Sequence, residues 1–151
     1  MIELWLEPAA QEEILAHCLS AHPKEACGLL AGNARRSPGE PERRAAYVYP
    51  MRNVEDSPIG YAMDPKEQLT VEKTMRQRQQ RLLGIYHSHT QTEAYPSPVD
   101  VSLAISPDLS YVLVSLKTLT QPDLRSYRID GAKVLEEPVH LQGFGHIVRG
   151  A

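Results

Sequence analysis

An apolar segment, residues 82–86, runs directly into His87-Ser88-His89, and this stretch limits the choice of fold more than any other. Its length and apolar character predict a strand. Side chains alternate across a strand, so His87 and His89 share one face of the sheet. Helical and strand patterns interleave on both sides of this segment. The chain is therefore predicted to be α/β or α+β, with one central sheet.

The other elements are predicted from apolar periodicity and from the proline, glycine and aspartate residues that begin or end them. Residues 33–44 are polar and are expected to form an exposed loop. The expected helices are 8–22, 65–81 and 98–105, and the expected strands are 2–6, 26–31, 45–49, 61–63, 111–116, 124–129 and 134–141, with the last two forming a hairpin around Asp130-Gly131.

Length and composition narrow the class of protein. A chain of 151 residues is expected to form one domain, residues 1–151. The net charge of −3 provides no basic surface for nucleic acid, and no apolar run approaches the roughly 20 residues of a membrane span. The first residues lack the basic region of a signal peptide, so a cytoplasmic protein is expected. The two cysteines form no C-x-x-C motif and are expected to be small buried residues.

His87 and His89 are candidate metal ligands. Two imidazoles on one face of a strand, about 6–7 Å apart along the backbone, can converge on a single cation. Imidazole is a common zinc ligand. By itself, however, an H-x-H sequence is also compatible with a chance pair at the surface end of a strand.

Ser97-Pro98-Val99-Asp100 has the pattern of a helix start. Serine caps the helix, proline occupies its first position, and the aspartate returns a hydrogen bond to the cap. This local role alone explains the pattern. The same helix start could also direct Asp100 toward the imidazoles as a third ligand and leave the Ser97 hydroxyl free to donate to an oxyanion.

Glu25 stands just before the apolar strand predicted at residues 26–31. It could be a solvated residue at the sheet edge. A hydrolytic zinc site, however, needs three protein ligands, an open position for water and a base that accepts the proton of that water. Two histidines, Asp100 and Glu25 supply this set.

The joint spacing is more specific than any of its parts. Glu25 is followed by His87-Ser88-His89, seven intervening residues, Ser97, two residues and Asp100. This order resembles the JAMM motif of the MPN-domain (MPN+) zinc metalloproteases, in the compact form of their small prokaryotic branch. The resemblance extends from about residue 25 to residue 137. Thr90 departs from the proline that often follows the second histidine, which affects only the expected shape of the loop.

The resemblance implies a single-domain α/β/α sandwich around a central mixed sheet, an architecture related to cytidine deaminases. The H-x-E and P-C-x-x-C elements of a deaminase are absent from the sequence. In the JAMM family, residues matching His87, His89 and Asp100 bind one Zn²⁺ per chain. Glu25 would then be the catalytic base, and Ser97 would stabilise the oxyanion.

The resemblance also implies a substrate. Family members hydrolyse the amide or isopeptide bond after the C-terminal tail of a ubiquitin-like protein, and in prokaryotes we expect a sulfur carrier that releases cysteine or a short peptide. The tail could add a strand in a groove formed by residues 52–63 and 90–96. Three alternatives stay open: a peptidase acting on a cell-wall or phage-tail peptide, a non-catalytic MPN scaffold, and a structural zinc module. A homodimer also stays open.

The remaining histidines, the tryptophan and Cys27 are expected to have no part in the chemistry. His17 and His22 are expected at the surface, and His140 and His146 have no partner that the sequence identifies. Trp5 is expected to pack in the core or at a sheet edge, and Cys27 is expected not to be a metal ligand.

Overall fold

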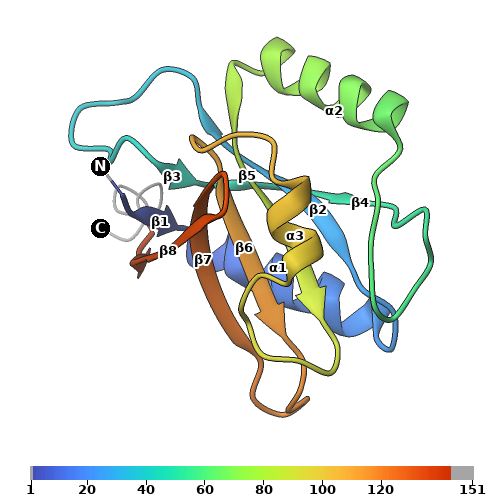
Figure 1. The fold of residues 1–151 in the computed structure, drawn as a ribbon. Coiled ribbons are helices and arrows are strands. Elements are labelled where there is room, and N and C mark those ends of the chain that lie inside the picture. Colours follow the sequence, from blue (N-terminus) through green and yellow to red (C-terminus); the bar gives the residue numbers. More distant parts are fainter. Residues whose placement is uncertain (1, 144–151) are drawn as a thin grey trace.

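A computed structural model describes residues 2–143. Its centre is a six-stranded mixed sheet in the order β4-β2-β5-β6-β7-β8. Helix α1 lies behind this sheet and α3 in front of it (Figure 1). The elements are β1 (Leu4–Leu6), α1 (Pro8–Ala21), β2 (Cys27–Asn33), β3 (Arg44–Ala45), β4 (Tyr47–Met51), α2 (Pro65–Gln77), β5 (Gln80–His89), α3 (Pro98–Leu103), β6 (Ser110–Ser115), β7 (Asp123–Asp130), β8 (Lys133–Glu137) and β9 (Val139–Leu141).

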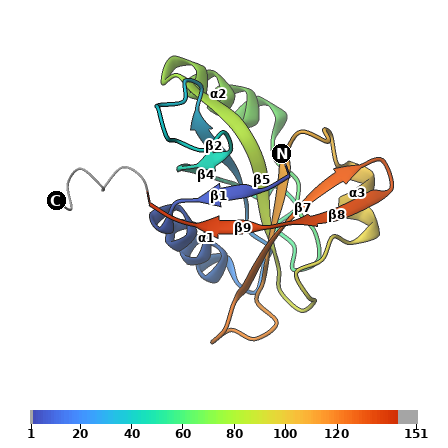
Figure 2. The ribbon, with the colours of Figure 1, turned by 90° about the vertical axis from the view of Figure 1, so that its left-hand side faces the viewer.

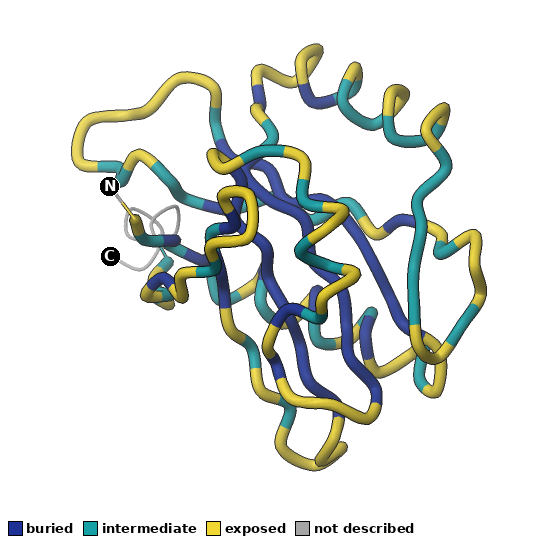
Figure 3. Tube along the Cα trace, in the orientation of Figure 1, coloured by how far each residue is buried: buried dark blue, intermediate teal, exposed yellow. Residues whose placement is uncertain are grey.

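Strand β5 occupies the middle of the sheet. It pairs antiparallel with β2 and parallel with β6, while the other neighbouring strands of the sheet are antiparallel. A smaller sheet of three parallel strands, β3-β1-β9, lies beside the main one, and Figure 2 shows β1 next to β9. The expected strand that ends in His87-Ser88-His89 is therefore central and buried (Figure 3).

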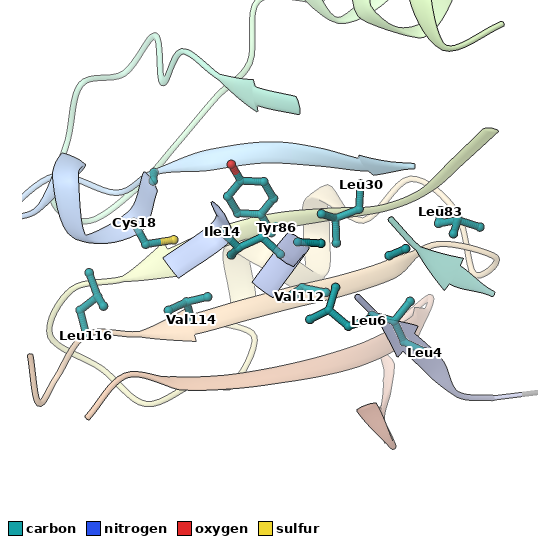
Figure 4. Close-up of a cluster of buried hydrophobic side chains, with 13 residues drawn as sticks. Leu4, Leu6, Ile14, Cys18, Leu30, Leu83, Tyr86, Val112, Val114 and Leu116 are labelled. Atoms are coloured by element: carbon teal, nitrogen blue, oxygen red, sulfur yellow. The ribbon is translucent and has the colours of Figure 1, made fainter. Parts of the chain in front are cut away.

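Alternation along the strands divides the core into two layers. On β6, Val112 and Val114 pack with Ile14 and Cys18 of α1, and Figure 4 shows this cluster. Tyr111, on the opposite face of the same strand, packs with Met75 of α2. Val101 of α3 packs on that second layer. Helices thus cover both faces of a mixed sheet, which confirms the predicted α/β/α sandwich.

Helix α2 begins where the sequence predicts but ends earlier. The Asp64 carboxylate accepts a hydrogen bond from Lys66 N at 3.0 Å, which caps the helix. The prediction of a helix to residue 81 is wrong, because α2 ends at Gln77 and β5 begins at Gln80. Gln79 adopts a φ of 58°, a left-handed conformation that cannot continue a helix.

The C-terminal segment differs from the expected single strand over residues 134–141. The hairpin forms as predicted, with Gly131 at a φ of 60° in the turn. Pro138 then separates β8 from β9 because proline lacks the N–H that a sheet needs. Strand β9 leaves the main sheet and pairs with β1.

Other differences are small. Residues 61–63, expected as an extended piece, belong to no strand, and α3 ends at Leu103 rather than near residue 105. His146 lies outside the described residues. Between residues 2 and 143, no helix is long and apolar enough to cross a bilayer.

Candidate metal centre

Strand pairing brings Glu25 to the two histidines. Strands β2 and β5 are antiparallel with Cys27 opposite His87. The pairing continues toward the site, because Ser88 N donates to Ala26 O at 3.0 Å and the Ser88 hydroxyl accepts from Ala26 N at 2.9 Å. One residue further, Glu25 lies beside His89. Residues two apart share a face, so Glu25 and both histidines lie on the α3 side of the sheet.

His87, His89 and Asp100 converge on one point. The His87 Nε2 atom lies 3.2 Å from His89 Nε2 and 3.3 Å from Asp100 Oδ1. The His89 Nε2 atom lies 3.0 Å from Asp100 Oδ2. One donor atom from each of the three residues thus falls within 4.8 Å of the others.

Local helix geometry orients Asp100. The Ser97 hydroxyl oxygen accepts a hydrogen bond from Asp100 N at 3.1 Å, and Ser97 N donates to Asp100 Oδ2 at 2.8 Å. This is the capping box predicted from the sequence. It directs the Asp100 carboxylate toward the sheet, and it uses only the acceptor side of the Ser97 hydroxyl.

Burial and proximity set the protonation of these groups. Burial lowers the pKa of His87 below its ordinary value, so its imidazole is neutral. Burial opposes the charged form of His89 too, but contacts with Asp100 outweigh it and raise the pKa of His89. For Asp100, burial would raise the pKa, yet hydrogen bonds from both histidines hold it well below the ordinary value. Asp100 is therefore a carboxylate.

Glu25 has the properties of a base. Glu25 is only 7% exposed. Burial raises the pKa of the Glu25 carboxyl to about 7; nearby His89 lowers it, whereas Asp100 and Glu55 raise it. A carboxyl group with a pKa near neutrality can both accept and return a proton under physiological conditions.

A hollow of about 510 Å³ opens over these residues. Both loops predicted to form a groove, residues 52–63 and 90–96, contribute to its walls, together with the start of α3. The apolar part of its wall includes Ile59, Val99 and Leu103, which are exposed. The hollow is therefore open to solvent and can admit an extended chain.

Asn53 holds the first of these loops against the site. Its side-chain nitrogen donates to Glu25 O and to Gly60 O, each at 3.0 Å. Its side-chain oxygen accepts from Glu55 N and from Ala62 N, each at 3.1 Å. One amide thus makes four hydrogen bonds, which is its full capacity. The loop and the backbone of Glu25 are tied together as one unit.

Further contacts fix the two histidines. The Tyr61 ring stacks on the His87 imidazole, with ring centroids 4.4 Å apart. The His89 Nδ1 atom lies 2.9 Å from Glu93 O, so Nδ1 is the donor and Nε2 is presented to the centre. Neither Tyr61 nor Asn53 was singled out by sequence reasoning. In the sequence, only their position in a loop expected to line the groove indicated a role for them.

The donor set is suited to zinc. Two imidazole nitrogens and one carboxylate oxygen match the three protein ligands of a catalytic zinc site, which leaves the fourth position open. The Cys27 sulfur is not part of this group; the thiol lies 4.0 Å from Met51 O, and burial raises its pKa to about 12. That Cys27 is not a ligand stays a prediction.

Two other histidines, His17 and His140, have partners that sequence reasoning missed. His17, expected at the surface, is half-buried, and its Nδ1 atom lies 2.6 Å from the Tyr86 hydroxyl. His140 stacks on Trp5, with ring centroids 4.3 Å apart, and its Nε2 atom lies 3.0 Å from Glu3 Oε1. These contacts join elements far apart in sequence, and they lie away from the residues of the metal centre.

A mixed sheet between helices, with H-x-H at the end of a central strand and S-x-x-D at the next helix start, is the arrangement that the resemblance to JAMM/MPN proteins implies. Within that class the chain belongs to the prokaryotic homologues of the JAB domain, whose family model matches residues 7–130. The resemblance stated from the motif is confirmed.

Two curated relatives differ in their sequence identity to this chain. A CysO-cysteine peptidase of Mycobacterium tuberculosis is 48% identical over 128 residues, which cover 85% of this chain and 84% of that protein. A probable TtuB-protein conjugate cleaving protease of Thermus thermophilus is 37% identical over 102 residues, covering 67% of this chain and 63% of that protein.

Solved structures agree with the fold. A protein from Desulfitobacterium hafniense matches with a TM-score of 0.82 and 41% identity, covering 95% of this chain and 97% of that one. A JAB1/MPN domain protein from Archaeoglobus fulgidus matches with a TM-score of 0.55 and 17% identity, covering 91% and 97%. The second match supports the fold alone.

Proposed function

We propose that this protein is a zinc-dependent peptidase. It hydrolyses the amide bond after the C-terminal tail of a ubiquitin-like sulfur-carrier protein and releases cysteine or a short peptide. The observation that carries this proposal is the convergence of His87, His89 and Asp100 within 4.8 Å, beside a hollow that His89, Asp100 and Glu25 line. The relatives named as a CysO-cysteine peptidase and a conjugate-cleaving protease support the choice of substrate.

In this proposal His87 Nε2, His89 Nε2 and one Asp100 oxygen hold the metal. When bound, zinc lowers the pKa of a water molecule toward about 7 and polarises the carbonyl of the bond to be cleaved. The contact between His89 Nδ1 and Glu93 O keeps the Nε2 lone pair directed inward.

Glu25 moves the proton. Its carboxylate accepts a proton from the attacking water, whose oxygen bonds to the carbonyl carbon. The protonated Glu25 then delivers that proton to the departing nitrogen as the C–N bond breaks. The new carboxyl group stays on the carrier tail, and the amine leaves with the adduct. A pKa raised by burial suits both halves of this transfer.

Ser97 stabilises the carbonyl oxygen while negative charge develops on it. Its hydroxyl oxygen accepts the capping bond from Asp100 N, and no residue among 2–143 accepts its hydrogen. That hydrogen can therefore be donated to the substrate. Comparable donors lower the barrier by on the order of 3–4 kcal/mol.

The carrier tail lies in the groove between residues 52–63 and α3. The exposed side chains of Ile59, Val99 and Leu103 provide apolar contacts along an extended chain. Residues 1–151 act as one domain in this scheme. A non-catalytic scaffold is the weaker alternative, because a buried carboxyl group beside the three ligands has a clear use only in hydrolysis.

Mass spectrometry of the intact substrate tests the proposal. The substrate is a ubiquitin-like sulfur carrier that ends in Gly-Gly followed by cysteine. We expect a product ending at Gly-Gly with zinc-loaded protein only, and none with chelator or with Glu25→Gln. Glu25→Gln should keep its zinc, because no ligand is removed. An uncut substrate beside fully zinc-loaded wild-type protein would contradict the proposal.

A further inference from the structure

Two hollows border the metal centre. The first, of about 510 Å³, contains the groove described above. The second, of about 440 Å³, extends past residues 91–95 to Lys117. His89 and Ser97 belong to the walls of both. A substrate whose reacting bond lies at these residues therefore extends into both hollows.

The two hollows differ in charge. The first is lined by the carboxyl groups of Glu25, Glu55 and Asp100 and by no lysine or arginine. The second is lined by Lys117. Within residues 2–143, Lys117 is the only lysine or arginine in the wall of either hollow. A negative group on a substrate is repelled by the carboxyl groups of the first hollow, whereas Lys117 offers it an opposite charge in the second.

The fold places Lys117 on the face of the sheet that holds the metal ligands. Parallel pairing sets Ser115 of β6 opposite His89 of β5, and Lys117 follows two residues later. Ser115 faces the loop before α3, since its hydroxyl donates to Thr92 O at 2.6 Å. Strand β6 ends at Ser115, and Lys117, in the bend that follows, lines the same hollow as His89 and Ser97.

The backbone at Lys117 is held in place. Leu116 N donates to His89 O at 2.8 Å, and Lys117 N donates to Ser115 Oγ at 3.3 Å. The side chain of Lys117 is exposed and forms no ion pair with any residue that the structure describes. The backbone at Lys117 is thus fixed next to His89, and the exposed side chain of Lys117 is available to a substrate.

We propose that the second hollow receives the leaving group, and that Lys117 binds the free α-carboxylate of a leaving group that is a single amino acid. This inference rests on the proposed function. In such a substrate the carboxylate is attached to the carbon next to the departing nitrogen. An isopeptide adduct on a lysine side chain has no carboxylate there. Lys117 therefore favours release of one amino acid over cleavage of a protein conjugate.

Glu93 is the opposing charge in this hollow. It is exposed, lines the same wall, and forms no ion pair with Lys117 within the described part of the chain. Its carboxylate repels a substrate carboxylate. Glu93→Gln should therefore strengthen the preference for a free carboxylate, and the backbone contact from Glu93 O to His89 is kept.

Two substrates test the inference. Both are carriers ending in Gly-Gly-Cys, one with a free carboxylate and one with a carboxamide. We expect zinc-loaded wild type to cleave the acid with a kcat/KM about fivefold higher than that for the carboxamide. This ratio corresponds to the free energy of one exposed ion pair. Lys117→Met should remove this preference by slowing cleavage of the acid substrate alone, and Lys117→Arg should keep the preference. High salt should reduce it, because salt screens exposed charges.

Lys66→Met, a change at an exposed lysine on α2, is the matched control and should leave the preference intact. Equal cleavage of acid and amide by wild type would overturn the inference, as would a preference that survives Lys117→Met. Cleavage of neither substrate would instead contradict the proposed function, and the inference would fall with it.

Discussion

The ring of Tyr61 lies on the imidazole of His87, with 4.4 Å between ring centroids and 28° between the ring planes. Tyr61 stands in the loop that Asn53 ties to Glu25, whereas His87 lies near the end of the central strand β5. One contact therefore connects the substrate groove to a metal ligand. The orientation of that ligand depends on a segment distant from it in sequence.

Replacement of Tyr61 should weaken metal binding without removing a ligand. Tyr61→Ala frees the His87 ring, and we expect a loss of about tenfold or more in zinc affinity, as is typical when a group supporting a metal ligand is removed. Tyr61→Phe keeps the stack and should keep the affinity. Competition titration with a chromogenic chelator measures both. Equal affinity of Tyr61→Ala and wild type would show that the stack does not orient His87.

Asp100→Ala should lose zinc and also weaken the start of α3. The capping bond from Ser97 N disappears, at a cost of about 1 kcal/mol. Asp64→Ala is the matched control, because the Asp64 carboxylate also accepts a backbone hydrogen bond at the start of a helix. It should cost a similar free energy of unfolding and leave the zinc content unchanged. Metal analysis and chemical denaturation separate the two effects. Full zinc content in Asp100→Ala would exclude Asp100 as a ligand.

Glu25 should make the metal-free protein less stable as pH rises. Its folded pKa of about 7 lies above the ordinary value of 4.5, so the folded state binds this proton more tightly than the unfolded state does. Stability is therefore lost between about pH 4.5 and 7 and stays lost above pH 7. In chelator at pH 8, Glu25→Gln should be more stable than wild type by on the order of 1–3 kcal/mol.

The difference in the free energy of unfolding between Glu25→Gln and wild type should shrink as the pH falls toward 4.5. Glu55→Gln serves as the control, because Glu55 lines the same hollow but is exposed, and the change should alter stability little. Urea denaturation at several pH values measures the effect. Equal stability of Glu25→Gln and wild type at pH 8 would refute it.

Asn53→Asp should lower both stability and kcat. The change removes the two N–H groups that hold Glu25 O and Gly60 O and sets an anion against them. We expect a loss of about 1–3 kcal/mol in the free energy of unfolding. Because Glu25 moves with the loop, kcat should fall more than KM rises.

Asn33→Asp is the comparison for Asn53→Asp. Asn33 donates to Glu40 and accepts from Tyr47, at the far end of β2 from Glu25. Its replacement should also cost stability, but kcat should stay unchanged under conditions where the protein is folded. If both variants kept wild-type kcat, Asn53 would have only a structural role.

Local patterns predicted much of the fold. Helix α1 ends where His22-Pro23 was expected to end it, and the β7–β8 hairpin turns at Gly131. The errors lie where tertiary pairing overrides local preference. Gln80 joins β5 instead of extending α2, because it pairs with Asn33 of β2. The segment after Pro138 leaves the main sheet, because β1 offers it a partner.

The sequence by itself determined the parts of the site that depend on short spacings. Strand alternation places His87 and His89 on one face, and a capping box orients Asp100. Backbone geometry dictates both, so they can be read from neighbouring residues. Only the tertiary structure decided that Glu25 lies beside His89, that Tyr61 stacks on His87, and that Lys117 borders the second hollow. Those relationships depend on strand register and loop packing, which are set by the burial of side chains far apart in the chain.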